Sequence, residues 1–345
     1  MRIAIVTDAA PSQINGVVNT LQETCRCSRN DGHEVLLISP DDAATFACPT
    51  YPEIRLAYKP YARVAAMLRG FQPDCIHIST EGPMGLAARR FCLRHRIGFT
   101  TAYHTRFPEY LSARALLPMA LTYRWLRWFH GPSKSVMVPT PQVLQTLAAR
   151  GFRQLALWGR GVDTVRFRPM EQGRANITGP LYLYVGRIAI EKNIAAFLEA
   201  ELPGSKWIIG DGPMREELQQ RYPDAQFLGN KSHQELSAYY NCADVLVFPS
   251  HTDTFGLVML EAMACGVPVA AYPVSGPIDV VADGRSGSLD LDLTRACKKA
   301  LQLDREQVRA HALTYSWEAA TQQFLQSLHR IEWANAAALT QSSIA

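Results

Sequence analysis

A loop and a helix between two apolar runs carry two carboxylates at a spacing that suits a sugar-phosphate ligand. The apolar runs 243–250 and 268–272 predict buried strands, and between them Asp253 and Glu261 stand eight positions apart. Free N–H groups and the dipole at the expected helix start near Gly256 favour a phosphate. The loop acid could accept hydrogen bonds from sugar hydroxyls, and the helix acid could accept them from a ribose. Alternatively, the first acid only caps the helix and the second is solvated.

Two cations follow another predicted strand upstream. Arg187 and Lys192 lie in the string G-R-x-x-x-x-K-N, directly after the apolar run 180–185. A guanidinium and an ammonium near a helix start suit a diphosphate. When a sugar–phosphate bond breaks, negative charge grows on the leaving diphosphate, and fixed cations stabilise that charge more than they stabilise the ground state. The alternative is an ordinary pair of surface cations.

Together, the two motifs resemble the retaining GT-B glycosyltransferases of the group 1 or family 4 type, which include bacterial lipid-directed α-mannosyltransferases and sulfoquinovosyl- or glucosyl-lipid synthases. The resemblance covers nearly the whole chain. It implies an α/β fold with two Rossmann-like parallel-sheet domains facing a cleft and a C-terminal helix that crosses back to the first domain. Both acids are normally Glu in that family, whereas here the first is Asp253. The implied donor-binding residues are Gly16, Arg187, Lys192, Asp253, Thr254, Phe255, Gly256, Leu257 and Glu261.

Bulk composition excludes several classes of protein. A chain of 345 residues with 48% hydrophobic content can build two domains, and a net charge of +4 is too weak to indicate nucleic-acid binding. No apolar run is long enough to span a membrane, and residues 2–8 predict a strand rather than a signal peptide. The eight cysteines show no zinc or redox spacing, so we expect reduced thiols and a cytoplasmic protein.

The first half alternates predicted strands with predicted helices, which indicates a parallel sheet that binds ligands beyond the carboxyl ends of its strands. The strands are expected at 2–8, 33–40, 53–58 and 73–80. Asn15-Gly16 predicts a turn after the first strand, where Gly16 would let the backbone approach a ligand closely or would simply form the turn. One glycine is far weaker than G-x-G-x-x-G, so no nicotinamide dinucleotide is predicted.

A later strand end supplies a histidine and leads into a basic, aromatic segment. His104 ends the string FTTAYH, where the resemblance implies a contact with the transferred sugar; a histidine held by local backbone is the alternative. Arg106 could meet the acceptor or a phosphate; the alternative is a simply exposed arginine. Residues 109–134 mix aromatic and apolar residues with Arg124 and Arg127, a pattern typical of a helix lying on an anionic membrane, although a core-facing helix is equally allowed. Pro118 should divide this segment into two helical pieces.

The remaining chain divides at a linker and repeats the alternation. Residues 155–169 predict a connector in which Asp163 holds backbone, and polar residues 171–179 mark the boundary. The expected domains are 1–168, 169–315 and a helix-plus-tail 316–345, with a long helix over 315–339. The resemblance makes Asn230 and Lys231 weak candidates for the nucleotide base.

The resemblance implies transfer with retained anomeric configuration, by front-face attack in which the leaving phosphate accepts the acceptor proton. No D-x-D metal motif stands in a suitable context, because Asp290 and Asp292 fall at an expected helix start. No metal or cofactor is therefore predicted, and the nucleotide sugar is a substrate. GDP-mannose and UDP-glucose types of donor are both allowed, with a lipid or glycan acceptor and a peripheral position at the cytoplasmic face of the inner membrane. The alternatives are a non-catalytic GT-B partner subunit, a nicotinamide oxidoreductase, and a peripheral membrane-binding protein without chemistry.

Overall fold

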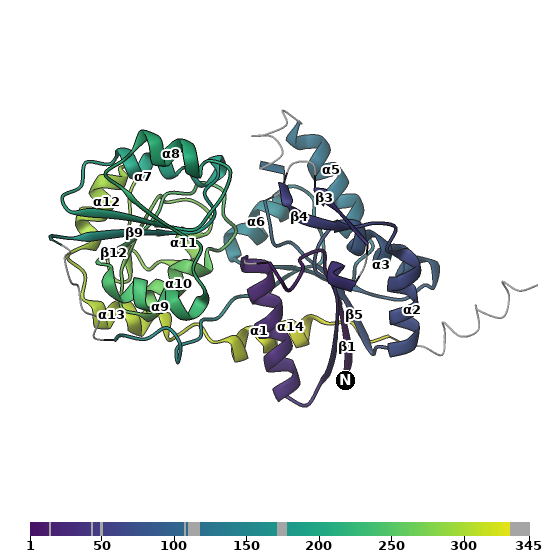
Figure 1. Cartoon of the computed structure of the whole chain (residues 1–345). Coiled ribbons are helices and arrows are strands. Elements are labelled where there is room, and N and C mark those ends of the chain that lie inside the picture. The colour runs from purple at the N-terminus through teal and green to yellow at the C-terminus, as the bar shows by residue number, and fades with distance from the viewer. Residues whose placement is uncertain are drawn as a thin grey trace, which may run out of the picture. The chain divides into compact units, whose positions relative to one another are not determined.

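The computed structural model describes residues 1–13, 15–42, 44–48, 51–106, 108–109, 118–170 and 178–331. The chain forms two compact units (Figure 1). The first contains residues 1–159 and 317–345, and the second contains residues 160–316. Each unit is built around its own six-stranded parallel sheet, so the predicted α/β class with two Rossmann-like sheets is confirmed.

The sheet of the first unit has the order β2-β1-β5-β6-β7-β8. Its strands are β1 (Arg2–Val6), β2 (Glu34–Ile38), β5 (Cys75–Ile78), β6 (Thr100–Ala102), β7 (Val136–Val138) and β8 (Leu155–Leu157). The helices are α1 (Gly16–Asn30), α2 (Tyr61–Phe71), α3 (Pro83–Arg94), α5 (Met119–His130), α6 (Pro141–Ala149) and α14 (Trp317–Ser327), with a 3-10 turn η1 (Pro40–Asp42). Apolar cores fill both faces of the sheet, one beneath α2 and α3 and one beneath α1 and α14.

One predicted strand does not join the parallel sheet. The predicted strand 53–58 overlaps β4 (Tyr51–Ala57), which pairs antiparallel with β3 (Thr45–Cys48) in a separate two-stranded sheet. The prediction of a further parallel strand here is therefore wrong. Only two residues separate β3 from β4, and a link that short permits a hairpin but not the crossover that parallel strands require.

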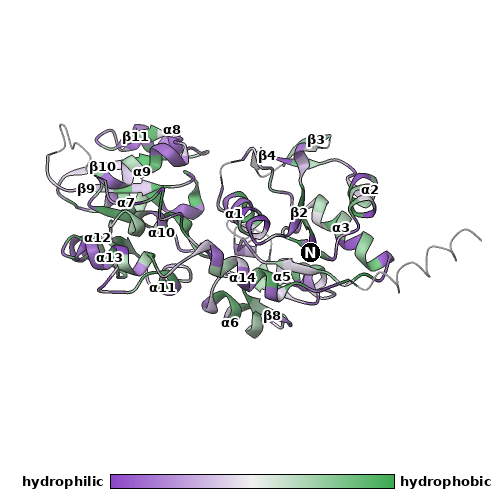
Figure 2. Ribbon diagram, turned by 90° about the horizontal axis from the view of Figure 1, so that it is seen from below, coloured by the Kyte–Doolittle hydropathy of each residue, from purple (hydrophilic) through white to green (hydrophobic). Residues whose placement is uncertain are grey.

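The sheet of the second unit has the order β11-β10-β9-β12-β13-β14. Its strands are β9 (Leu181–Val185), β10 (Ser205–Ile209), β11 (Gln226–Gly229), β12 (Val245–Phe248), β13 (Val269–Ala271) and β14 (Gly287–Leu289). The helices are α7 (Ile194–Glu199), α8 (Arg215–Arg221), α9 (His233–Cys242), α10 (Leu257–Ala264), α11 (Pro277–Val280), α12 (Leu293–Ala300) and α13 (Arg305–Ala312), with a 3-10 turn η2 (Ile190–Lys192). In Figure 2, α12 and α13 are largely hydrophilic. Four residues of α12 and two of α13 are buried in the core.

The division between the units differs from the one that composition suggests. The first unit ends at Gly159 before the linker, whereas the sequence predicts that the linker residues up to 168 belong to the first domain. The structure corrects this, because Val162 and Phe167 are buried in the core of the second unit. Asp163 does hold backbone as expected: its Oδ1 accepts hydrogen bonds from the amides of Val165 and Arg166 at 3.1 and 3.0 Å.

The C-terminal helix returns to the first unit, as predicted, but it is shorter than predicted. α14 packs beside α1 and ends at Ser327 instead of continuing through 339 (Figure 1). Beyond it, Arg330 forms a backbone bridge with Cys75, and the amide of Ile331 donates to the carbonyl of Asp74 at 2.8 Å. The chain leaves the helix because this extended pairing at the start of β5 competes with a further helical turn. Residues 332–339 lie outside the described part of the chain.

Candidate active site

The strand order of the second unit brings the two predicted motifs to one place. The chain proceeds from β9 outward through β10 to β11, and then returns to place β12 on the other side of β9. Sheets of this kind bind ligands at the point where the strand order reverses, beyond the carboxyl ends of the two central strands. The Arg187/Lys192 motif follows β9, and the Asp253/Glu261 motif follows β12.

The loop after β9 is shaped by a 3-10 turn and an asparagine. Asn193 closes the turn η2 and adopts φ +52°, a left-handed conformation that asparagine tolerates better than most residues. Its Nδ2 donates a hydrogen bond to the carbonyl of Pro249 at 3.3 Å. The side chain of Thr252 donates to the carbonyl of Glu191 at 3.4 Å. These bonds tie the loop after β9 to the loop after β12.

Lys192 and Asp253 form an ion pair between these two loops. The Nζ–Oδ1 distance is 2.5 Å, and the two side chains are 19% and 15% exposed. The other carboxylate oxygen, Oδ2, is buried and makes no hydrogen bond among the described residues. Buried polar atoms in folded proteins nearly always have a partner, so an orphaned acceptor beside a cation marks a place that a ligand can complete.

The helix that follows starts at a glycine for steric reasons. Gly256 caps α10 with φ +86°, and a Cβ there would lie 2.8 Å from Met259 and 2.9 Å from Phe248. Phe255 is buried in the core, so only its backbone faces the loop, and Leu257 is the first helical residue. Thr254 lies between Asp253 and Phe255 in the chain and is half-buried.

A second loop packs against the backbone of this one. Gly276 has φ +96°, a conformation that favours glycine, and a Cβ there would lie a tight 3.2 Å from the carbonyl oxygen of Asp253. The hydroxyl of the preceding Ser275 is buried without a hydrogen-bond partner among the described residues. Two neighbouring loops therefore each present an unsatisfied buried polar atom.

Glu261 is a buried carboxyl rather than a solvated one. It is 5% exposed, and Tyr240 on α9 donates a hydrogen bond to its Oε2 at 2.8 Å. Burial raises the pKa of Glu261 to about 7, while the Tyr240 bond and the charge of Arg166 act in the opposite direction. The interpretation of Glu261 as a solvated helix acid is therefore wrong.

The remaining residues predicted to bind the donor follow the strands β9 and β11. Arg187 follows β9 after Gly186, and its carbonyl accepts a hydrogen bond from the hydroxyl of Tyr184 at 2.7 Å. Asn230 and Lys231 follow β11, which is separated from β9 by β10. The ammonium of Lys231 lies 5.4 Å from the ring centroid of Tyr239.

The predicted residues of the first unit lie beyond the carboxyl ends of its strands. Gly16 is the first residue of α1, so the predicted turn is the start of a helix. The Asn15 side chain caps this helix by accepting hydrogen bonds from the amides of residues 17 and 18. His104 is buried, with its ring 5.4 Å from that of Trp158. Arg106 pairs with Glu109 at 3.2 Å, so a carboxylate already partly neutralises it.

The two acids of the D-x-D string have structural roles. Asp292 caps α12 by accepting from the amides of Thr294 and Arg295, and Asp290 pairs with Arg295 and Lys299. In the described part of the chain, no three His, Cys, Asp or Glu residues gather closely enough to hold a metal ion.

Comparison with known proteins identifies the chain's family. Residues 14–166 match the family Glycosyltransferase Family 4, and residues 179–302 match Glycosyl transferases group 1. A GDP-mannose-dependent alpha-mannosyltransferase of Mycobacterium tuberculosis is 30% identical over 316 residues, which cover 84% of this chain and 83% of that protein. The chain belongs to the group 1 and family 4 glycosyltransferases. The predicted family is thus confirmed.

Further similarities extend over nearly the whole glycosyltransferase. A sulfoquinovosyl transferase of Arabidopsis thaliana is 29% identical, over 93% of this chain and 72% of that protein. The solved structure of a sucrose-phosphate synthase from Thermosynechococcus elongatus aligns with a TM-score of 0.74 at 21% identity, covering 94% and 97% of the two chains. Anabaena HepE in complex with UDP-glucose aligns with a TM-score of 0.73 at 16% identity, covering 95% and 99%. The two structures share the GT-B fold with this glycosyltransferase.

Sequence reasoning missed two residues of the candidate site. Tyr240 lies at helical spacing from Leu236, where a tyrosine normally indicates core packing. Ser275 lies in a turn-rich stretch with nothing to distinguish it from other loop serines. Their proximity to Glu261 and Asp253 depends on contacts between segments that lie about 20 residues apart along the chain.

Proposed function

We propose that this glycosyltransferase is a metal-independent, retaining hexosyltransferase that moves a mannose- or glucose-type sugar from a nucleotide diphosphate to a lipid or lipid-linked glycan. The observation that carries this proposal is the Lys192–Asp253 pair with its orphaned oxygen, at the reversal point of the second sheet. Relatives named as using GDP-mannose, and one named as a monoglucosyldiacylglycerol synthase of Streptococcus pneumoniae, support the donor and acceptor classes.

Each part of the donor has a matching group in the second unit. Arg187 and Lys192 take the diphosphate, together with the amides around Gly256, because cations and a helix start stabilise its charge. Oδ2 of Asp253 accepts a hydrogen bond from a hydroxyl of the hexose. Glu261 accepts hydrogen bonds from the ribose hydroxyls, and the backbone after β11 contacts the base.

The transfer breaks one bond and forms another at the anomeric carbon. The bond from that carbon to the β-phosphate oxygen breaks, the acceptor oxygen bonds to the same face, and the acceptor proton passes to the leaving phosphate oxygen. Lys192 stabilises the charge that grows on this phosphate. A double displacement would need a carboxylate nucleophile opposite a second carboxyl group. Glu261 is committed to Tyr240 and the ribose, which favours the front-face route.

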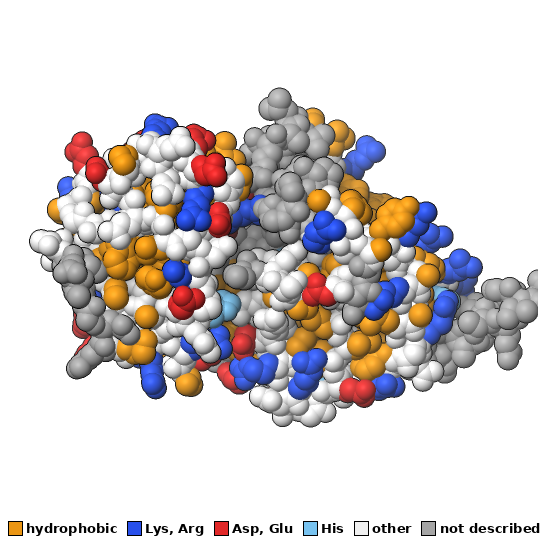
Figure 3. Space-filling model, viewed as in Figure 1, with side chains coloured by type: hydrophobic (Ala, Val, Ile, Leu, Met, Phe, Trp, Pro, Cys, Tyr) orange, Lys and Arg blue, Asp and Glu red, His pale blue; other side chains and the backbone are white. Residues whose placement is uncertain are grey.

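We assign the acceptor and a membrane contact to the first unit. Residues 1–159 carry 18 Lys and Arg against 10 Asp and Glu, whereas residues 160–316 carry 16 against 19. Figure 3 shows Lys and Arg side chains gathered over α2 and α3 on the displayed face of the first unit. His104 and Arg106 follow β6 of this unit and would meet the transferred sugar and the acceptor.

The helix α5 presents the face that best suits a membrane surface. Its exposed large apolar residues are Met119, Leu121, Trp125 and Trp128, and its exposed cations are Arg124 and Arg127. The guanidinium of Arg89 lies 3.9 Å from the ring centroid of Trp128 and donates to the last carbonyls of α5, so the helix end is held in place. No helix in the described ranges is long and apolar enough to span a membrane. A peripheral position on the cytoplasmic leaflet follows from this proposal.

Charge reversal on α5 should detach the protein from anionic vesicles. With Arg124→Glu/Arg127→Glu, we expect at least a tenfold loss of binding in flotation with phosphatidylglycerol vesicles, since each basic residue near such a surface contributes about 1 kcal/mol. Lys298→Glu/Lys299→Glu, an equal charge change on α12, is the control and should float like wild type. Equal flotation of all three proteins would remove α5 as the membrane contact.

A ligand screen in EDTA tests the proposed reaction against the alternatives. We expect GDP or UDP, but not NAD or ADP, to raise the melting temperature, because a ligand of the native state stabilises it. Turnover of the matching nucleotide sugar should persist in EDTA. Stabilisation by NAD would favour an oxidoreductase. Nucleotide binding without turnover would favour a non-catalytic subunit. Flotation without nucleotide binding would favour a peripheral membrane protein that lacks chemistry. Loss of turnover in EDTA would overturn metal independence.

A further inference from the structure

We propose that Tyr240 is a positioning residue for the donor, whose hydroxyl fixes the carboxylate of Glu261 in the orientation that receives the ribose. The inference rests on the ribose role of Glu261 in the proposed function and adds a residue that does not itself touch the substrate. Tyr240 lies on α9 and Glu261 on α10, and both belong to the second unit.

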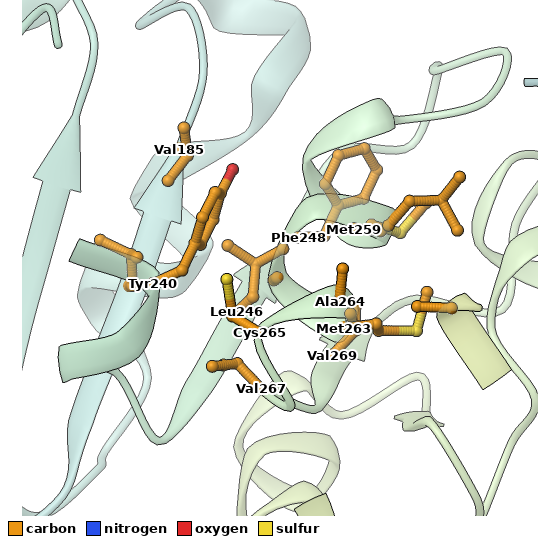
Figure 4. Packing of buried hydrophobic residues seen from close by; sticks show 14 of the residues in the cluster. Val185, Tyr240, Leu246, Phe248, Met259, Met263, Ala264, Cys265, Val267 and Val269 are labelled. Carbon is orange, nitrogen blue, oxygen red and sulfur yellow. The ribbon is translucent and has the colours of Figure 1, made fainter. Parts of the chain in front are cut away.

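The geometry of the pair supports a fixed orientation. Tyr240 is completely buried, and its hydroxyl donates to Oε2 of Glu261 at 2.8 Å. The ring of Phe167 meets the tyrosine ring edge-on, with 5.8 Å between centroids. Figure 4 shows the Tyr240 ring between Val185 and Leu246, with its hydroxyl at the end nearer Val185, the last residue of β9. The hydroxyl therefore points from the core toward the carboxyl end of the sheet.

The bond leaves half of the carboxylate available. Oε2 is occupied by Tyr240, whereas Oε1 makes no hydrogen bond among the described residues. When one carboxylate oxygen is held by a hydrogen bond, the other points in a fixed direction. The side chain is therefore ordered before the ligand binds, which lowers the entropic cost of binding. A vicinal diol of a ribose donates two hydrogen bonds, which suits such an acceptor.

The hydrogen bond also favours the charged form of the carboxyl. Burial raises the pKa of Glu261, and the Tyr240 hydrogen bond is the largest of the effects that lower it. A protonated carboxyl is a weaker acceptor for hydroxyl groups, so loss of the tyrosine hydroxyl should weaken ribose binding in two ways. It removes the anchor, and it reduces the fraction of carboxylate.

Tyr240→Phe tests the inference because it deletes the hydroxyl and keeps the buried ring. The readout is the dissociation constant, by calorimetry on the full chain, for GDP and UDP and for their 2′,3′-dideoxy counterparts. We expect wild type to prefer the ribose form at least tenfold. In Tyr240→Phe, the affinity for the ribose form should fall about tenfold while that for the dideoxy form stays unchanged. A purely structural tyrosine would affect both forms alike.

The matched control is Tyr182→Phe. Tyr182 is a fully buried tyrosine of the same unit, packed in the core on the opposite face of the sheet, and its hydroxyl has no hydrogen-bond partner among the described residues. This variant should keep the wild-type preference. If Glu261→Gln loses the ribose preference but Tyr240→Phe retains it, the inference fails while the proposed function stands. If wild type binds neither nucleotide, or Glu261→Gln keeps the preference, the ribose role fails and the inference with it.

Discussion

Lys192→Ala lowers kcat for sugar transfer about a thousandfold, the largest effect that we expect from a single substitution in this protein. The ammonium lies at the carboxyl edge of the second sheet, 2.5 Å from Asp253, and the lysine side chain is only 19% exposed. A fixed cation in such a site stabilises charge that develops on the leaving diphosphate, and removing one preorganised group of this kind typically costs two to three orders of magnitude. Single-turnover assays with the matching nucleotide sugar would measure the chemical step separately from product release.

Two variants separate the role of this lysine from a general effect of charge. Lys298→Ala removes an exposed lysine of α12 and should transfer sugar at the wild-type rate. Lys192→Arg keeps the charge but changes its geometry, so we expect intermediate activity. The KM for the donor should rise less than kcat falls, because the interaction strengthens as the bond breaks. Near-wild-type kcat in Lys192→Ala would refute the assignment of this cation to the leaving group.

Asp253→Asn should reduce kcat/KM about a hundredfold. The substitution keeps the size of the side chain but removes the charge that holds Lys192, and it exchanges one acceptor oxygen for a donor. Hydrogen bonds to charged groups contribute roughly 1.5–3 kcal/mol, and leaving the partner charge unsatisfied adds to the loss. Asp253→Glu should stay within about tenfold of wild type, because the resembled family normally has Glu at this position and the charge is preserved.

The double variant Lys192→Ala/Asp253→Asn shows whether the two side chains act together. Since their charged groups are in direct contact, the two losses should not add, and the double variant should transfer sugar about as slowly as Lys192→Ala alone. Fully multiplicative losses would mean that the pair does not function as a unit. Wild-type activity of Asp253→Asn would remove Asp253 from the hexose site.

Much of the fold was predictable because its signals are local. Continuous apolar runs alternate with helical spacing, and this pattern determines two parallel sheets whatever their strand order. It failed at residues 53–58, where an apolar run looks the same in a hairpin as in a parallel strand. It also failed at the end of α14, because the bridge between Arg330 and Cys75 joins segments 255 positions apart.

The candidate site also combines features that the sequence predicted with features that it could not predict. The sequence alone determined which residue types follow which strands: cations after β9, acids after β12, and a histidine after β6. Only the tertiary structure decided that β12 lies beside β9, which brings Lys192 against Asp253. Only the tertiary structure could also reveal Tyr240 beneath Glu261 and the pairing of Arg106 with Glu109. The physical reason is that periodicity reports the direction in which a side chain leaves its own helix or strand, whereas its partner depends on how distant segments pack.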